Sequence, residues 1–162
     1  MSLKIRAGKR CLKRFCASVA AAGLLAGIAV SFRSPADAFC FDEAARKYNL
    51  PPLLLRTIAQ EESGLDVNAA GWNPDGSVDV GLMQINSWWE EKLGRARWVG
   101  LCTDPCYNVM IGAWILADCI YRYGYTVDGI GCYNASSPEK RAKYTDKILR
   151  RALGQENKAS TK

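Results

Sequence analysis

The amino-acid sequence predicts an α+β domain in which helix predominates and the strands are confined to one small β-hairpin region. The 162 residues suit one compact domain and are too few for two ordinary ones. Several segments carry apolar residues at helical spacing between start and stop signals, whereas one stretch is dominated by turn residues. We therefore expect helices packed around a single hairpin.

The first elements are expected to be two helices followed by the hairpin. Residues 41–48 form a short helical pattern, and Pro51-Pro52 begin a second helix, where the missing proline N–H removes no hydrogen bond. Residues 68–81 are rich in Gly, Asn, Asp and Pro, and residues 77–80 alternate in polarity. This combination is typical of a small, turn-rich hairpin.

Two longer helices are expected in the second half of the chain. Asp104-Pro105 begins a helix whose apolar pattern runs to about Tyr123, where Gly124 stops it. A last helix begins at residues 136–139 and is expected to end near Gly154. Residues 151–162 are polar enough to be assigned to a disordered tail.

The formal net charge of +6 comes entirely from the first 38 residues, which hold seven basic residues and one acid (7 − 1 = +6). Residues 39–162 hold fifteen of each, so the body of the protein offers no reason to expect nucleic-acid binding. Residues 1–38 have a basic start, an uncharged stretch and the small-x-small site Ala36-Asp37-Ala38, as in a secretory signal peptide. The alternative is a membrane anchor. We expect cleavage before Phe39, no stable membrane span afterwards, and an exported, periplasmic protein.

The cysteine and histidine content limits which catalytic mechanisms and metal sites are possible. Five cysteines remain after the leader, and an exported chain meets an oxidising compartment, so disulfides are expected, with at least one thiol left over. The chain contains no histidine, which excludes Ser-His-Asp and Cys-His catalysis and weakens a zinc site built on the Cys-x3-Cys at residues 102–106. No metal and no cofactor are expected.

Two adjacent glutamates end the second predicted helix, and their directions differ. At about 100° per residue, Glu62 projects into the middle of an apolar stripe, whereas Glu61 lies at its edge and is expected to point outward. Loss of hydration raises the pKa of an inward acid, which keeps a proton available for general acid catalysis near neutrality. The alternative is that Glu62 is simply the final turn of a surface helix.

The downstream segment Gly81-Leu-Met-Gln-Ile-Asn-Ser-Trp-Trp89 mixes apolar residues, amides and paired tryptophans. This mixture suits a ring-shaped polar ligand such as a sugar, which is hydrogen-bonded by amides and stacked on aromatic faces. The aliphatic residues are expected to be ordinary core. Gln84 and Asn86 are harder to explain as core, because a buried amide needs several partners.

Three motifs in order resemble those of the lysozyme-like lytic transglycosylases, especially the small exported enzymes that accompany secretion and conjugation systems. They are Glu62-Ser63, residues 81–84 (Gly-Leu-Met-Gln) and Tyr133-Asn134-Ala135, and the resemblance covers residues 39–150. A more distant resemblance to C-type lysozymes rests on residues 73–89, on residues 101–106 and on Cys119. Both families imply a lysozyme-like fold and peptidoglycan glycan strands as substrate.

The resemblance also implies roles for individual residues. Glu62 is similar to the catalytic acid and Ser63 to its hydroxyl neighbour. Met83 and Gln84 are similar to residues of the sugar-binding groove, to which we add Asn86 from the argument above. Tyr133 and Asn134 are similar to the pair that braces the acid from the far side. Cys132 and Ser136 depart from the family pattern, which usually has Ala and Gly there.

The implied reaction is cleavage of the β-1,4 bond between N-acetylmuramic acid and N-acetylglucosamine. In the transglycosylase scheme Glu62 is first acid and then base, and a 1,6-anhydro ring closes without water. In the lysozyme scheme a second carboxylate assists hydrolysis, and Asp79 lies where C-type lysozymes keep that acid. The alternative for Asp79 is a hairpin residue that accepts hydrogen bonds from backbone N–H groups.

The C-type resemblance further implies a disulfide between Cys102 and Cys119, which would leave Cys106 to pair with Cys40 and Cys132 unpaired.

Two functions without catalysis stay open. One is a peptidoglycan-binding module, which gains nothing from an inward acid. The other is a structural partner of a secretion or conjugation apparatus, with the basic last helix as its surface.

Overall fold

The computed structural model describes residues 39–160, so the predicted signal peptide lies outside the described residues. Within that range the protein is mostly helical and has one small antiparallel sheet, which confirms the predicted fold class. In chain order the elements are α2 (Phe41–Tyr48), α3 (Pro52–Glu62), β1 (Ala70–Trp72), β2 (Val78–Val80), β3 (Ile85–Asn86), α4 (Trp89–Leu93), α5 (Arg95–Thr103), α6 (Pro105–Tyr123), α7 (Val127–Gly131) and α8 (Pro138–Ser160).

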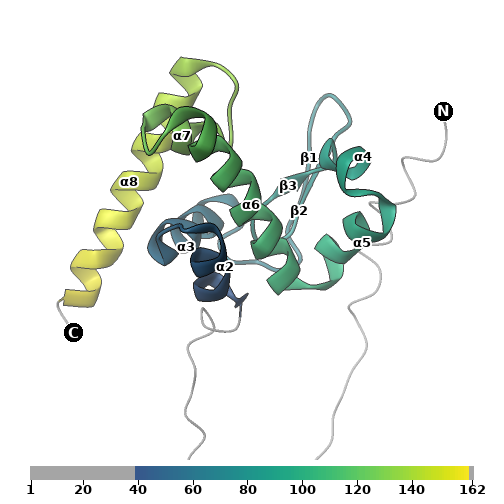
Figure 1. Cartoon of the computed structure of the whole chain (residues 1–162), viewed down its shortest axis with the longest axis horizontal. Helices are drawn as coiled ribbons and strands as arrows, with labels where there is room; N and C mark the ends of the chain where they lie inside the picture. The colour runs from purple at the N-terminus through teal and green to yellow at the C-terminus, as the bar shows by residue number, and fades with distance from the viewer. Residues whose placement is uncertain (1–38, 161–162) are drawn as a thin grey trace, which may run out of the picture.

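The central element is α6, whose ends follow local signals in the sequence. The Asp104 side chain accepts a hydrogen bond from the Tyr107 N–H at 3.0 Å, and Pro105 occupies the first turn. Gly124 ends the helix with φ +72°, a conformation that glycine adopts without strain. In Figure 1, α6 runs through the middle of the protein. The sheet, α4 and α5 lie on one side of it, and α7 and α8 lie on the other side.

The core lies where α3, α6 and α8 meet the segment between β2 and β3. Its fully buried side chains include Leu55 and Ile58 of α3, Leu116 of α6 and Ile148 of α8. Each such side chain stabilises the fold by about 1.5–3 kcal/mol relative to an exposed one. The core therefore holds the C-terminal end of α3 in a fixed place against α8.

The sheet is slightly larger than the predicted hairpin. Its order is β1-β2-β3, and the third strand pairs Asn86 with Asp79, which in turn faces Gly71 on β1. Because directly opposed residues share a face, these three positions lie together on one side of the sheet. The β-strands thus bring Asp79 and Asn86 next to each other.

The last helix differs from the prediction. α8 continues to Ser160, so it passes through Gly154 and through most of the segment that was assigned to a disordered tail. Gly154 does not have the positive φ of a glycine that ends a helix. Glycine inside a helix costs only about 1 kcal/mol, and the Gln, Glu, Lys and Ala that follow are good helix formers.

The disulfide prediction is half right. Cys40 pairs with Cys106 as expected, but Cys119 pairs with Cys132, so the predicted Cys102–Cys119 bridge and the unpaired Cys132 are both wrong. Cys102 lies beside the start of α6, whereas Cys119 is near its end. At 1.5 Å per residue the helix separates them by about 20 Å, far beyond the 7 Å limit for a disulfide.

None of the helices in the described part of the chain is both long enough and apolar enough to span a membrane.

Candidate active site

Glu62 is the last residue of α3, and packing on both sides fixes its place. Leu55, Ile58 and Ala59 bury the inner face of the helix. Ser63 then ends the helix, and its hydroxyl donates to the Ala59 carbonyl at 3.1 Å and to the Leu82 carbonyl at 2.9 Å. The inward direction predicted for Glu62 is therefore correct, and Ser63 holds the end of α3 against the segment between β2 and β3.

The environment of Glu62 suits a proton donor. Burial raises the pKa of Glu62 to about 7, against the lowering effect of a hydrogen bond that the Tyr144 hydroxyl donates to its Oε1 at 2.6 Å. The negative charges of Glu61 and Asp79 add to the rise, and Lys147 opposes it. An acid with a pKa near 7 is protonated about half of the time at neutral pH and can act as both acid and base.

Glu61 does not point outward into solvent, which corrects the expectation from the single helix. Its side chain is only 9% exposed, because Lys147 and Arg151 of α8 cover it. Burial alone would raise the pKa of Glu61, but hydrogen bonds and charges from both basic residues outweigh it and lower the pKa below its ordinary value. Glu61 is therefore a fixed anion beside a titrating Glu62.

Asp79 is held by amides of the hairpin. Asn73 Nδ2 donates to its Oδ2 at 2.8 Å, and Asn86 Nδ2 donates to its Oδ1 at 2.8 Å. These donors are side-chain amides and not the backbone N–H groups that were expected. Asn86 is also bonded to Ser77 Oγ and, through its own oxygen, to the Trp88 N–H. Both polar groups of the Asn86 side chain therefore have partners in the sheet region or just after it, so its role in sugar binding stays a prediction.

The segment between β2 and β3 is built around a sharp turn. Gln84 has φ +46°, and its Nε2 donates to the Gly81 carbonyl at 2.8 Å and to the Ala69 carbonyl at 3.3 Å. Met83 is fully buried, so its side chain does not line a groove as the resemblance implied. It packs against Gly112 of α6, where a Cβ would lie 2.7 Å from its side chain. Met83 contributes its backbone to the site.

Asn108 was not anticipated from the sequence. This buried α6 residue accepts from the Met83 N–H at 2.9 Å and donates to the carbonyls of Val80 and Leu101. It lies against Gly81, where a Cβ would come within 2.2 Å of its Nδ2. The glycine at position 81 is thus required by this close approach as well as by its own positive φ.

Tyr133 supports the same turn from the other side. Its hydroxyl donates to the Met83 carbonyl at 2.7 Å, and burial keeps its pKa well above the ordinary value, so it stays a neutral donor. The hydroxyl that contacts Glu62 belongs instead to Tyr144 of α8, which sequence reasoning missed. Asn134 is exposed, and its backbone N–H bonds to the Gly131 carbonyl. Tyr133 therefore supports Glu62 only indirectly, through the Met83 turn. The role implied for Asn134 in bracing Glu62 stays a prediction.

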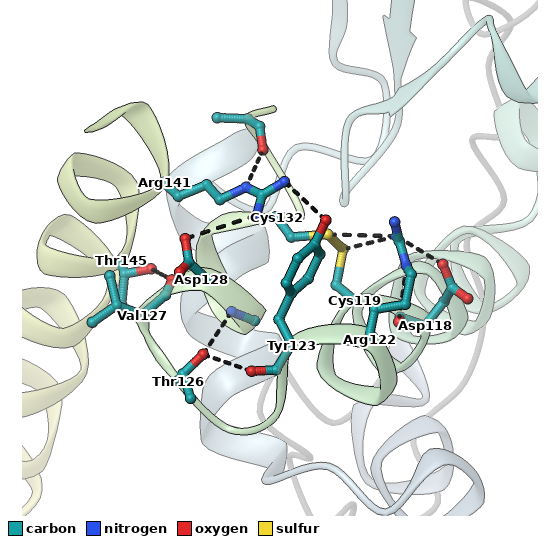
Figure 2. The surroundings of a disulfide bond; sticks show 12 residues. Asp118, Cys119, Arg122, Tyr123, Thr126, Val127, Asp128, Cys132, Arg141 and Thr145 are labelled. Carbon is teal, nitrogen blue, oxygen red and sulfur yellow. Dashed lines mark hydrogen bonds and ion pairs between the residues drawn. A yellow bond between two sulfur atoms is a disulfide. The ribbon is translucent and has the colours of Figure 1, made fainter. Parts of the chain in front are cut away.

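The loop that carries Tyr133 is anchored at both ends. At one end, the disulfide with Cys119 ties Cys132 to α6 (Figure 2). At the other end, Arg141 Nε donates a hydrogen bond to the Ala135 carbonyl at 3.0 Å. Arg141 also lies over the Tyr123 ring, 4.3 Å from its centroid. Ser136 does not adopt a positive φ, so the chain turns here without the glycine that the family usually has.

One group of side chains in the described part of the chain comes close enough to share a metal ion. It consists of Cys40, Glu43 and Cys106. Because the two cysteines form a disulfide with each other, they have no thiolate to offer a metal.

Comparisons with known proteins agree with this geometry. A family model described as "Transglycosylase SLT domain" matches residues 39–151. The chain is 41% identical over 115 residues to the invasion protein IagB of Salmonella typhimurium, covering 67% of this chain and 72% of the relative. It is 38% identical over 120 residues to protein IpgF of Shigella flexneri, covering 70% and 79% respectively. It is also 38% identical over 119 residues to X polypeptide of Escherichia coli, covering 68% and 70%.

Proposed function

The chain belongs to the transglycosylase SLT domain family of peptidoglycan lytic transglycosylases, and from this premise we propose that Glu62 is its single catalytic carboxylate. The bond cleaved is the β-1,4 bond between N-acetylmuramic acid and N-acetylglucosamine. The observation that carries this proposal is the inward, largely buried place of Glu62 beside the Tyr144 hydroxyl, 2.6 Å from Oε1, where burial raises its pKa to about 7. A carboxyl group with this pKa holds a proton at neutral pH and can also take one back.

In the first step, the Glu62 proton moves to the glycosidic oxygen, and the bond from that oxygen to the muramic C1 breaks. N-acetylglucosamine leaves as the alcohol, and positive charge develops on the muramic ring. Glu62 becomes a carboxylate at the same time. The Tyr144 hydroxyl, 2.6 Å from Oε1, stabilises this new charge, because hydrogen bonds to ionised acceptors are stronger than those to neutral ones.

In the second step, the Glu62 carboxylate takes the proton of the muramic C6 hydroxyl. The freed C6 oxygen attacks C1 and closes the 1,6-anhydro ring, so water is not consumed. Glu62 is protonated again and ready for the next bond. One carboxylate is sufficient for both steps.

Asp79 has a place in the hairpin that requires no catalytic role. Each of its oxygens accepts an amide N–H from the hairpin, which gives Asp79 a clear structural role. In the alternative, a lysozyme-type hydrolase, Asp79 would stabilise or capture the sugar cation and water would complete the reaction. A peptidoglycan-binding module without catalysis is the other alternative, but it has no use for a Glu62 proton.

Zymography on purified cell wall tests the proposal. Glu62→Gln keeps the size of the side chain but removes the transferable proton, so glycan cleavage should be abolished while cell-wall binding remains. Asp79→Asn should retain most activity if one carboxylate suffices. An active Glu62→Gln variant, or an Asp79→Asn variant that folds but cannot cleave, would overturn the single-carboxylate mechanism.

We further propose that the protein is exported to the periplasm and opens the cell wall locally for a secretion or conjugation apparatus. The signal-peptide pattern at residues 1–38 supports export, as do the two disulfides. The name of the Salmonella relative, an invasion protein, fits a role beside such an apparatus. Intact mass of the periplasmic protein should begin at Phe39, and a membrane-bound chain that keeps its leader would contradict export.

A further inference from the structure

The two glutamates at the end of α3 occupy an unfavourable place for negative charge. The C-terminal end of a helix carries a partial negative charge, so acids there are normally disfavoured. The last turn of α3 contains no basic residue that would compensate them. The compensation must come from outside the helix.

That compensation comes from one face of α8. Tyr144, Lys147 and Arg151 are spaced at i, i+3 and i+7, so they lie along the same side of the helix. The Tyr144 hydroxyl meets Glu62, whereas Lys147 and Arg151 both meet Glu61. Arg151 bonds to Glu61 Oε2 through Nε at 2.9 Å and Nη2 at 2.8 Å, and Lys147 Nζ pairs with Oε1. Both carboxylate oxygens of Glu61 are therefore held by α8.

We propose that Glu61 is a positioning residue, which fixes α8 so that Tyr144 meets Glu62 and sets the pH range in which Glu62 carries its proton. This inference rests on the proposed function, in which Glu62 is the catalytic acid. Glu61 itself touches neither substrate nor reacting atoms. It acts through the ion pairs with Lys147 and Arg151 and through its fixed negative charge.

The charge argument follows from the groups that face Glu62. From α3 and β2 these are the carboxylates of Glu61 and Asp79, and from α8 they are the Tyr144 hydroxyl and Lys147; Tyr133 adds a neutral hydroxyl. Glu61 favours the protonated form of Glu62, and Lys147 favours the ionised form. Because Arg151 also binds Glu61, removing Lys147 leaves Glu61 ionised.

Two single variants should therefore move the pH profile of kcat/KM in opposite directions. On the alkaline limb of this profile, kcat/KM falls because Glu62 loses its proton. Glu61→Gln removes a negative neighbour of Glu62, so this limb should shift to lower pH by about half a unit or more. At pH 7 this lowers the protonated fraction of Glu62 from about one half to about one quarter, a loss of about twofold. Lys147→Gln removes a positive neighbour, so the same limb should shift to higher pH.

The opposite directions separate this proposal from a purely structural role. Both variants weaken the contact between α3 and α8, and a loosened contact alone would separate Tyr144 from Glu62 and move the limb to higher pH in both. Asp146→Asn and Arg150→Gln are matched controls, because they remove one charge of each sign from an exposed pair on α8. The limb should stay at its wild-type position in both controls.

A titration of the Glu62 carboxyl carbon by NMR provides a readout independent of activity. The Glu62 signal, assigned by its loss in Glu62→Gln, should titrate at lower pH in Glu61→Gln and at higher pH in Lys147→Gln. Unchanged or parallel shifts would overturn the role of Glu61 even in an active enzyme. If the full chain cleaves no glycan, the proposed function fails, but the opposite shifts of Glu62 still decide whether Glu61 controls its protonation.

Discussion

Removal of the Tyr144 hydroxyl is the sharpest perturbation of the site, because it deletes one hydrogen bond and keeps the ring. Tyr144 is only 7% exposed, and its ring packs in the core, so Tyr144→Phe should fold normally. The hydroxyl donates to Glu62 Oε1 at 2.6 Å, which is short for a hydrogen bond between two oxygens. Phenylalanine cannot make this bond.

The expected magnitude follows from the change of charge on Glu62. A hydrogen bond to a charged group contributes about 1.5–3 kcal/mol, and one to a neutral group about 0.5–1.5 kcal/mol. The difference of about 1–1.5 kcal/mol is available only when Glu62 has given up its proton. Tyr144→Phe should therefore lower kcat by about 5- to 12-fold. The pKa of Glu62 should also rise, since the bond that favours its ionised form is lost.

The assay is the rate of solubilisation of purified peptidoglycan across a range of pH. The expected result is a lower rate at neutral and acidic pH and an alkaline limb shifted to higher pH, so that the rates of the variant and the wild type converge above that limb. Tyr125→Phe is the matched control, because Tyr125 donates its hydroxyl to the Asn49 carbonyl and lies on a different part of the fold. A Tyr144→Phe variant with wild-type rate and limb would refute the idea that this hydroxyl supports the charge of Glu62.

Three further predictions concern stability and covalent structure. Because the pKa of Glu62 rises from 4.5 unfolded to about 7 folded, unfolding releases a proton in this range and stability falls as pH rises through it. Glu62→Gln should therefore raise the free energy of unfolding by up to about 3 kcal/mol near pH 8 and very little near pH 4. Urea unfolding measures both changes, and equal changes at the two pH values would contradict this. Asn108→Ala should lower the free energy of unfolding by about 2–4 kcal/mol, because it leaves the Met83 N–H and two carbonyls unbonded, and a loss under 1 kcal/mol would argue against it. Peptide mapping without reductant should find Cys119 joined to Cys132; replacing both by alanine should cost about 3 kcal/mol for a separation of 13 residues, and either cysteine in another bridge would show the pairing to be wrong.

The parts of the fold that follow from the sequence are those governed by local chemistry. The start of α6 at Asp104-Pro105 and its end at Gly124 depend on capping within one turn, and both match the structure. The inward direction of Glu62 follows from the apolar stripe of its own helix. Such features need no knowledge of the neighbouring elements.

The misses arise where elements distant in sequence meet. Glu61 lies at the edge of the stripe when α3 is considered alone, but α8 covers that edge with Lys147 and Arg151. Tyr144 lies 82 residues beyond Glu62, and no local pattern joins the two. A signal was nevertheless present, because Tyr144, Lys147 and Arg151 share one face of a helix predicted from the sequence.

The full burial of Met83 shows a limit of arguing from motifs. Its position in the second motif implied contact with sugar, whereas the structure uses its side chain to fill the space beside Gly112. Its backbone then serves the site, since its N–H and carbonyl bond to Asn108 and Tyr133. A motif can therefore mark a residue that shapes the backbone of the site and does not itself touch the ligand.

The most direct test of the mechanism is mass spectrometry of the muropeptides released from purified peptidoglycan by the wild-type protein. The single-carboxylate mechanism of Glu62 predicts 1,6-anhydromuramyl ends, which are lighter than hydrolysed ends by one water. It also predicts that Glu62→Gln releases none of them. Products with only reducing ends, together with an inactive but folded Asp79→Asn variant, would contradict it and assign the protein the two-carboxylate chemistry of a hydrolase.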